Sequence, residues 1–431
     1  LVILGTYLLF NAGTTVVLQL LKKKKNYYYK PNNMISISNL VFRMKKNAVG
    51  LATIAILSSM VLVTLVGAAS IYAGKKDYLA SATPHDYSVA GNKVDLTSTK
   101  KLMDDFLIKT GEQANEEVAV SYLFFGIKNQ ETNKLTVFTK NERKAVPKSI
   151  VLVFSQETFK QLTGKELNLS SNQIALYTKN KTLKTQKSLS IDGKNYQIHR
   201  QLGDFINKKI PNIYKIIVSD YSYLVVPDIK IFESSMKGTS IAQATYVGVN
   251  VKDPTHDAKK NSDLLDQMTD KETQQLAGQT TGVSQSYLTA NSRYDAEGMV
   301  NGFVGGTFFI GIFLSIIFML GTVLVIYYKQ ISEGYEDRER FVILQKIGLD
   351  DFQVKQTIRK QVLTVFFLPL IFAFIHLAFA YHMISLIVRI IGVLNPDLML
   401  VVTIIVCGVF FLAYVLVFAL TSRSYRRIVS M

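Results

Sequence analysis

The chain has 431 residues, of which 48% are hydrophobic, and its 49 Lys and Arg against 32 Asp and Glu give a formal net charge of +17. Its single cysteine, Cys407, excludes a domain held together by disulfides within the chain. The polar block 75–300 carries only five of the excess positive charges, so the net charge does not require a nucleic-acid partner, and we expect none.

Five stretches of the chain contain no Asp, Glu, Lys or Arg and are each long enough for a helix to cross about 30 Å of hydrocarbon. We therefore predict an α-helical membrane protein with five transmembrane helices. A signal peptide is a weaker interpretation of the first stretch, because its basic residues follow the apolar run. Five buried helices in one soluble core are a poorer interpretation still. The predicted spans are 1–21, 47–74, 301–328, 362–388 and 398–420.

The chain opens at Leu1 within an apolar run, and we expect it to be a fragment of a longer protein. The segment 22–46 begins with a basic run that suits a cytoplasmic stretch held against anionic lipid headgroups. Ile37, Leu40, Val41 and Met44 then follow at helical spacing. This stripe predicts an elbow helix in the inner membrane interface, although a plain helical extension of the next span fits the periodicity equally well.

Orientation follows from the basic residues in the short connections. The segment 22–46 carries eight, 329–361 carries seven and the tail 421–431 carries three, whereas the loop 389–397 carries one. The positive-inside rule places the first three in the cytoplasm and the loop outside. We therefore predict a multi-pass protein of the cell membrane with an extracellular domain at 75–300.

The polar block 75–300 alternates strand-like and helix-like segments, which predicts a mixed α+β domain. We predict helices near 98–109, 157–163 and 257–277. The Gly-, Ser- and Thr-rich segment 278–294 is predicted to be a connection to the third span. Strands are predicted at 118–128, 135–140, 150–154, 173–179, 214–226 and 244–251.

The sequence contains no motif typical of nucleotide binding, nucleophilic hydrolysis or a zinc-dependent protease. His376 and His382 share one predicted span but sit six residues apart, so they are poorly placed to ligate one metal. We interpret both as hydrogen-bonded core or interfacial residues. We predict no catalytic, metal or cofactor site and no cofactor, and the ligand-binding residues remain unknown.

No predicted span contains a carboxylate, which disfavours a carrier driven by protons or sodium ions. A cytoplasmic ATPase is then the obvious source of energy. The hairpin 329–361 offers a docking surface of two short amphipathic helices, the first ending at Gly348 and the second capped by Asp350 or Asp351. An ordinary surface hairpin fits the composition equally well. The residues predicted to couple to the ATPase are Glu336, Arg338, Phe341, Leu344 and Gly348.

Two further features lie in the spans themselves. Gly302 and Gly306 form a G-x-x-x-G pattern at the start of the third span, where small residues allow close helix packing, within one subunit or at a hinge. Pro369 is predicted to kink the fourth span.

The layout and the phrase GYEDRERFVILQKIG at 334–348 resemble the C-terminal unit of an FtsX-like, MacB-type ABC transporter permease. The phrases YYKQISEGY at 327–335 and QVLTVFFLP at 361–369 narrow the resemblance to the bacitracin-export permeases, which confer antimicrobial-peptide resistance on Gram-positive bacteria. The resemblance implies a ten-span template of which this chain holds spans six to ten. It also implies an ATP-binding subunit docked around 336–348 that moves the outer domain by mechanotransmission.

The same resemblance implies further partners: a peptide antibiotic or its complex with an undecaprenyl-pyrophosphate lipid, and often a sensor histidine kinase. Membrane lipids are expected to surround the spans. A non-transporting receptor that signals to such a kinase is the alternative from another class, and it predicts that no ATPase binds the hairpin. A lipoprotein-release or cell-division FtsX relative is the alternative within the class.

Overall fold

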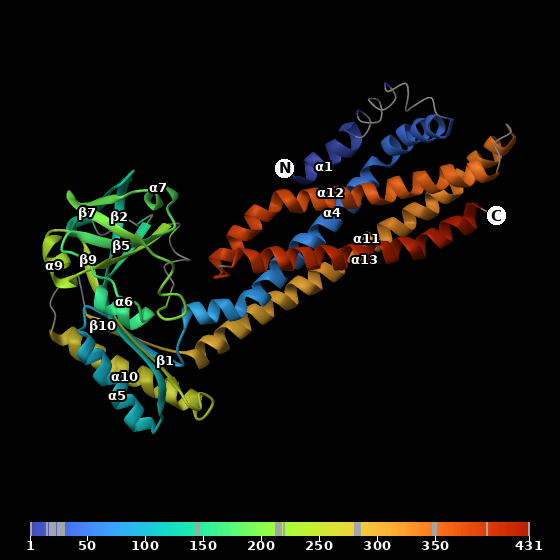
Figure 1. The fold of residues 1–431 in the computed structure, drawn as a ribbon. Coiled ribbons are helices and arrows are strands. Elements are labelled where there is room, and N and C mark those ends of the chain that lie inside the picture. Colours follow the sequence, from blue (N-terminus) through green and yellow to red (C-terminus); the bar gives the residue numbers. More distant parts are fainter. Residues whose placement is uncertain are drawn as a thin grey trace. The chain divides into compact units, whose positions relative to one another are not determined.

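The computed structural model describes residues 2–13, 16, 23, 31–142, 147, 149–211, 218, 220–279, 286–346, 351–393 and 395–429. The chain forms two compact units. Unit 1 comprises Leu1–Gly74, Val304–Val388 and Asn395–Met431, and unit 2 comprises Lys75–Phe303 and Arg389–Leu394. We describe each unit by itself, with the element labels of Figure 1.

Unit 1 is built from long apolar helices. Among the described residues four helices are long and apolar enough to cross a membrane, at Asn47–Ala82, Arg293–Glu336, Leu363–Ile390 and Pro396–Ser422. Residues 2–13 of the first predicted span form the short helix α1 (Val2–Leu8) and a π-helical turn (η1, Leu9–Gly13), and most of the rest of that span lies outside the described residues. A membrane protein with four such helices is therefore shown, whereas the predicted count of five is not confirmed.

The four long helices extend beyond the apolar windows. They are α4 (Pro31–Ala82), α11 (Arg293–Lys346), α12 (Asp351–Ile390) and α13 (Pro396–Val429). The backbone of α4 is helical from Pro31 onward, as the helical-extension alternative for 34–46 describes. In the described part of the hairpin, residues 329–346 belong to α11 and residues 351–361 to α12, rather than to separate short helices. Gly348 and Asp350 lie outside the described residues, and Pro369 lies inside α12.

Unit 2 is a mixed α/β domain with one ten-stranded sheet, ordered β10-β1-β9-β2-β3-β6-β7-β5-β8-β4. A further pairing of β2 with β4 closes the strands from β2 to β4 into a barrel. The strands are β1 (Tyr87–Asn92), β2 (Ala114–Glu131), β3 (Lys134–Val137), β4 (Ser149–Ser155), β5 (Gln173–Thr178), β6 (Ser188–Ile191), β7 (Lys194–Gln201), β8 (Asp220–Val226), β9 (Ile241–Val251) and β10 (Tyr287–Ser292). The helices are α5 (Leu96–Thr110), α6 (Gln156–Thr163), α7 (Lys181–Lys184), α9 (Ile229–Ser235) and α10 (Ala258–Gln279), with a short 3₁₀ turn, η2 (Lys140–Glu142).

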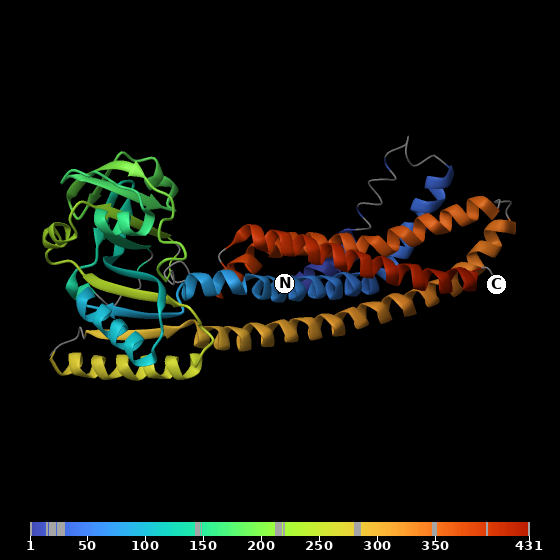
Figure 2. The ribbon, with the colours of Figure 1, turned by 60° about the horizontal axis from the view of Figure 1, so that its bottom comes forward.

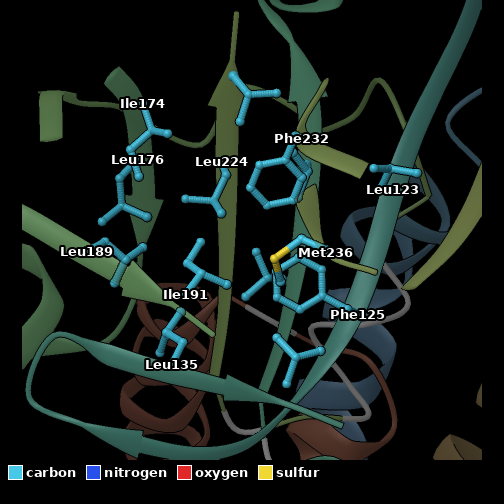
Figure 3. Packing of buried hydrophobic residues seen from close by; sticks show 14 of the residues in the cluster. Leu123, Phe125, Leu135, Ile174, Leu176, Leu189, Ile191, Leu224, Phe232 and Met236 are labelled. Atoms are coloured by element: carbon cyan, nitrogen blue, oxygen red, sulfur yellow. The ribbon is translucent and has the colours of Figure 1, made fainter. Parts of the chain in front are cut away.

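The long strand β2 joins the two halves of unit 2. Its first part pairs with β9 and its last part with β4 and β3. Side chains alternate across a strand, so Leu123, Phe125 and Ile127 enter one core while Val120 and Tyr122 enter another on the opposite face. Figure 3 shows the first of these cores, in which Phe125, Phe232 and Met236 pack against leucines and isoleucines of the barrel strands.

The four strands β10, β1, β9 and β2 are covered on one face by α5 and α10, which bury Phe106 and Leu265 in a third core. Asp95 caps the start of α5, accepting a hydrogen bond from Ser98 N, and Gly111 ends it at a φ of 70°. The free edge of β10 is capped by Thr273 of α10, whose hydroxyl donates to Leu288 O and accepts from Leu288 N. The segment 278–294, predicted as a connection to the third span, leads into α11 and also contains the strand β10, which was not predicted.

Candidate coupling site

The helices α4 and α11 of unit 1 pack side by side in opposite directions. At one end of this pair the ring of Tyr72 stacks on that of Phe308, with centroids 4.5 Å apart. Farther along, a Cβ built on Gly311 would lie only 2.3 Å from the Cβ of Ala68. The helix backbones thus approach closely because both residues are small, and any side chain larger than hydrogen at position 311 would push them apart.

Polar contacts continue the pairing of α4 with α11 in the same register along both helices. Thr64 and Ser315 share a hydrogen bond of 2.8 Å between their hydroxyl oxygens. Lys329 lies over Gly50, where a built Cβ would be 3.5 Å from the lysine Nζ. The contacts from Tyr72 to Asn47 span 25 residues of α4, or about 38 Å of helix. The pair is therefore long enough to cross a bilayer completely.

Three polar residues join α4 and α11 at the end opposite Tyr72, which the predicted orientation places at the cytoplasmic face. Asn47 Nδ2 donates to Glu333 Oε1 at 2.6 Å, and Lys329 Nζ donates to the backbone oxygen of Asn47 at 3.3 Å. Lys329 Nζ also lies 3.9 Å from Glu333 Oε1, with both side chains close to nine-tenths buried. Opposite charges placed together at such a site offset part of the cost of burying either one.

Gln330 lies beside this cluster and is only 8% exposed. Neither its amide nitrogen nor its amide oxygen has a hydrogen-bond partner among the described residues. The side chain lines a cavity of about 20 Å³ together with Glu333, Phe366 of α12 and Tyr414 of α13. A buried amide without partners costs about 1–3 kcal/mol. An arrangement of these helices that supplied a partner for the amide would be favoured by a similar amount.

The predicted coupling residues follow directly on α11. Glu336 and Arg338 are exposed, within three and five residues of Glu333. Phe341 and Leu344 belong to the helical backbone of α11, but their side chains, and the whole of Gly348, lie outside what the structure describes. Their coupling role stays a prediction.

The predicted packing glycines, Gly302 and Gly306, have no heavy atom of the described residues within 4 Å of a built Cβ. Their role in helix packing stays a prediction. The close contact occurs instead at Gly311, four residues before Ser315, opposite Thr64 and Ala68. These pairs of small residues four apart are a signal that the sequence analysis missed. It also missed the cluster around Glu333, because the charge at Lys329 marked the end of a span.

His376 of α12 lies in unit 1 between two other helices. Its Nδ1 is 3.0 Å from the hydroxyl oxygen of Ser59 in α4, and its Nε2 is 3.4 Å from that of Thr6 in α1. Both ring nitrogens thus have polar neighbours, as the interpretation of a hydrogen-bonded core histidine requires. No group of three or more His, Cys, Asp or Glu side chains suited to hold a metal occurs in the described part of the chain.

Unit 2 has a polar joint where the chain enters and leaves it. Arg293, the first residue of α11, donates from Nη1 to Asp86 Oδ1 at 3.0 Å and from Nη2 to the backbone oxygen of Pro84 at 2.5 Å. The other carboxylate oxygen of Asp86 accepts from Val251 N at 3.0 Å. The joint thus ties the residues after α4 to the start of α11 and to β9.

The start of α11 is itself capped. Ser292 accepts from Asp295 N at 3.1 Å and donates to the carboxylate of the same residue at 2.7 Å, and Ser262 of α10 also donates to that carboxylate. The bond from Asp295 N satisfies one of the free N–H groups at this helix start, and the two hydroxyl groups hold the carboxylate in place.

A buried histidine packs beside the joint. His85 Nδ1 lies 2.9 Å from the hydroxyl oxygen of Tyr246. A Cβ built on Gly248 would come within 2.4 Å of the same nitrogen, so glycine leaves the space that the ring occupies. Burial is the main cause that lowers the pKa of His85 below its ordinary value, with a smaller contribution from Arg293 in the same direction.

The ABC transporter permease protein YxdM of Bacillus subtilis is 24% identical over 384 residues, which are 88% of this chain and 56% of the relative. The bacitracin export permease protein BceB of the same organism is 23% identical over 88% of this chain and 55% of the relative. This chain is a homologue of ABC transporter permeases. It spans little more than half the length of these two relatives.

A third permease homologue, the uncharacterized ABC transporter permease YvcS of Bacillus subtilis, is 22% identical and covers the whole of this chain and 63% of its own length. No protein-family model matches the chain. A solved structure of a putative lipoprotein from Bacillus anthracis matches 41% of this permease homologue and 92% of its own chain at 13% identity, and its TM-score of 0.23 supports no conclusion about the fold. The relatives and the four apolar helices together indicate a multi-pass membrane protein of the permease class.

Proposed function

We propose that this chain is part of the permease subunit of an ABC transporter that protects the cell against peptide antibiotics acting on its envelope. The observation that carries the proposal is the match over 88% of the chain to a bacitracin export permease. Unit 2 is then the extracellular domain, and a separate ATP-binding subunit docks on the hairpin between α11 and α12. The peptide antibiotic or its undecaprenyl-pyrophosphate complex is the substrate that this role implies, and a sensor histidine kinase is a further partner.

The polar cluster of Asn47, Lys329 and Glu333 supports a route for coupling. It lies three residues before Glu336 on the helix that leads into the hairpin, so a force on the hairpin acts on the cluster first. Gln330 beside it has no hydrogen-bond partner among the described residues, so a movement that supplied one would be favoured. In the proposed cycle ATP hydrolysis shifts the pair of α4 and α11 together against α12 and α13, which also line the cavity at Gln330. Residues of both units belong to these two helices, which suits mechanotransmission to unit 2.

The proposal is tested by expressing the full-length protein, purifying it in detergent and identifying the proteins that copurify. We expect an ATP-binding subunit that is lost with Phe341→Asp. The control is Phe309→Leu, a conservative change on the exposed face of the same helix, which should retain the subunit.

A wild-type preparation without any ATPase would contradict the transporter and leave the receptor as the better account. An ATPase that copurifies with both the wild-type protein and the Phe341→Asp variant would support the transporter hypothesis but place the docking surface elsewhere. Protection is then measured as the bacitracin concentration that stops growth of cells with and without the intact protein. A permease whose loss changes no peptide-antibiotic susceptibility would refute the protective role.

A further inference from the structure

One segment of unit 2 has a charge surplus as large as that of the whole polar block 75–300. Residues 179–200 contain six Lys and Arg and a single acidic residue, Asp192. The rest of the block 75–300 contains 24 basic and 24 acidic residues, so this segment accounts for the whole surplus of five. The segment is thus strongly basic in a domain that is otherwise neutral in sum, although 134–148 is also basic, with five Lys and Arg and one Glu.

The strand order brings most of these residues to one end of the barrel. The segment links β5 to β6 through α7, and β7 runs parallel to β5, with Arg200 opposite Ala175. Lys187 precedes β6, and its backbone oxygen accepts from Ile198 N of β7 at 2.9 Å. Lys194 lies at the other end of β7, next to the turn from β6. We call the gathered residues the basic end: Lys179, Lys181, Lys184, Lys187 and Arg200.

The side chains of the basic end are exposed. Lys179 lies over the ring of Tyr221, with its Nζ 5.2 Å from the centroid. The other four form no ion pair with any described residue. Unpaired cations brought together repel one another, so this end of the barrel gains most from an anionic partner.

The acidic groups nearby do not neutralise it. Asp220 is partly buried and accepts from Asn180 Nδ2 at 2.7 Å. Asp204 is partly buried too, beside the tyrosines of the adjoining core. Asp192 sits at the turn beside Lys194 and accepts from Val137 N at 3.2 Å. The exposed field of the basic end is therefore positive.

The exposed side chains of the basic end favour a soluble partner over a lipid surface. None of the described residues between 179 and 200 is an exposed large hydrophobic side chain. Figures 1 and 2 show α7 and β7 at the opposite end of unit 2 from β1 and β10, the strands that connect to α4 and α11. Proteins that lie on membranes combine basic residues with apolar ones that insert, which this surface lacks.

We propose that the basic end of unit 2 binds a soluble polyanion. Lysines bind anionic groups as point charges, and Arg200 adds a planar fork that can hold two oxygens of one anion. Thr182 and Thr185 between the lysines are exposed and offer hydroxyl groups to the same ligand. Binding of this kind releases counterions and weakens steeply as salt rises.

The test uses the full chain in an uncharged detergent, with long-chain inorganic polyphosphate as the probe and binding followed by fluorescence anisotropy. We expect Lys181→Glu, Lys184→Glu and Lys187→Glu, introduced together, to weaken binding at least about tenfold. The matched control changes three other exposed lysines of unit 2 to Glu: Lys101, Lys165 and Lys271. It has the same net charge and should bind within about twofold of the unmodified chain.

Equal loss in both triple variants would overturn the proposal, because binding would then follow net charge alone. Absence of polyphosphate binding at low salt would overturn it as well. Flotation with phosphatidylglycerol vesicles that excess polyphosphate does not reverse, and that the Lys181, Lys184 and Lys187 variant loses, would assign the surface to a membrane instead. A triple Lys→Gln variant at the same positions, compared by circular dichroism, separates lost charge from lost fold and should also weaken binding.

Discussion

Arg293 Nη1 and Asp86 Oδ1 lie 3.0 Å apart, and this ion pair joins the two places where the chain enters and leaves unit 2. Asp86 is almost fully buried, whereas Arg293 keeps about a third of its side chain exposed. The carboxylate also holds the backbone of β9 through Val251. The pair therefore fixes the base of the sheet and the start of α11 at once.

Arg293→Ala is expected to destabilise unit 2 by about 2–3 kcal/mol, because it removes charged hydrogen bonds and leaves Asp86 buried without its cation. The measurement is hydrogen exchange of peptides from β1 and β10 in the full chain. Lys100→Ala, at the exposed pair with Glu117, is the control and should cost at most about 1 kcal/mol. Similar protection in both variants would show that the joint is not a stabilising element.

Acid is expected to destabilise unit 2 through His85. Burial lowers its folded-state pKa below 6.5, so between 6.5 and that lowered value the unfolded chain binds a proton that the folded chain does not. Stability contributed by the neutral ring is thus fully present above pH 6.5 and falls as the pH drops below it. Glu116 and Asp86 act in the opposite direction and limit the shift.

His85→Gln should flatten the fall in unfolding temperature of unit 2 between about pH 6.5 and pH 5. His199→Gln, at an exposed position of β7, should leave the fall unchanged. A wild-type profile that is already flat over this range would be inconsistent with the expected titration.

Gly311→Ala is expected to weaken the packing of α4 on α11, because the new Cβ meets that of Ala68 at 2.3 Å. Overpacking of this kind costs about 1–3 kcal/mol. Gly302→Ala has nothing within 4 Å in the described structure and should be neutral in the isolated chain. The measurement is the thermal unfolding midpoint of each variant in detergent, which should fall for Gly311→Ala and stay unchanged for Gly302→Ala. A larger loss for Gly302→Ala would favour the packing role predicted for G-x-x-x-G.

Gln330→Leu should raise the thermal unfolding midpoint of unit 1 and slow substrate-stimulated ATP hydrolysis by the assembled complex. Removing an unsatisfied buried amide stabilises the resting arrangement by about 1–3 kcal/mol. Tyr328→Leu, on the exposed side of the same helix, should change neither quantity. A stabilised protein with unaltered ATPase stimulation would exclude Gln330 from the cycle.

Glu333→Ala is expected to destabilise unit 1 by about 3 kcal/mol, because it removes the carboxylate that lies beside the buried Lys329. Replacing both residues, Lys329→Leu with Glu333→Leu, should recover much of the loss in unfolding midpoint. A double variant as unstable as the single one would show that the pair contributes through packing rather than charge.

Regular patterns were predictable from the sequence. The alternation of Val118, Val120 and Tyr122 indicated β2, and the apolar runs indicated four long helices that the structure contains. The strands β6 and β7 escaped prediction because β7 is exposed on most of its length and lacks an apolar alternation. β10 escaped because its Ser- and Thr-rich sequence imitates a linker.

The candidate site shows the same limit. A long-range contact such as Asn47 with Glu333 leaves no local mark, because each residue alone is an ordinary polar residue at the end of a span. Barrel closure through β2 and β4 depends likewise on which strand ends meet in space. The resemblance of the hairpin phrases pointed to the permease class, which the relatives confirm.

The contacts of α4 with α11 keep a constant stagger, so that Tyr72 meets Phe308, Ala68 meets Gly311, and Asn47 meets Glu333. Sliding one helix by a single turn, about 5.4 Å, would break all of these contacts together. Bending or rolling the two helices as one rod breaks none of them. While these contacts persist, a displacement of one helix along its axis therefore carries the other helix with it.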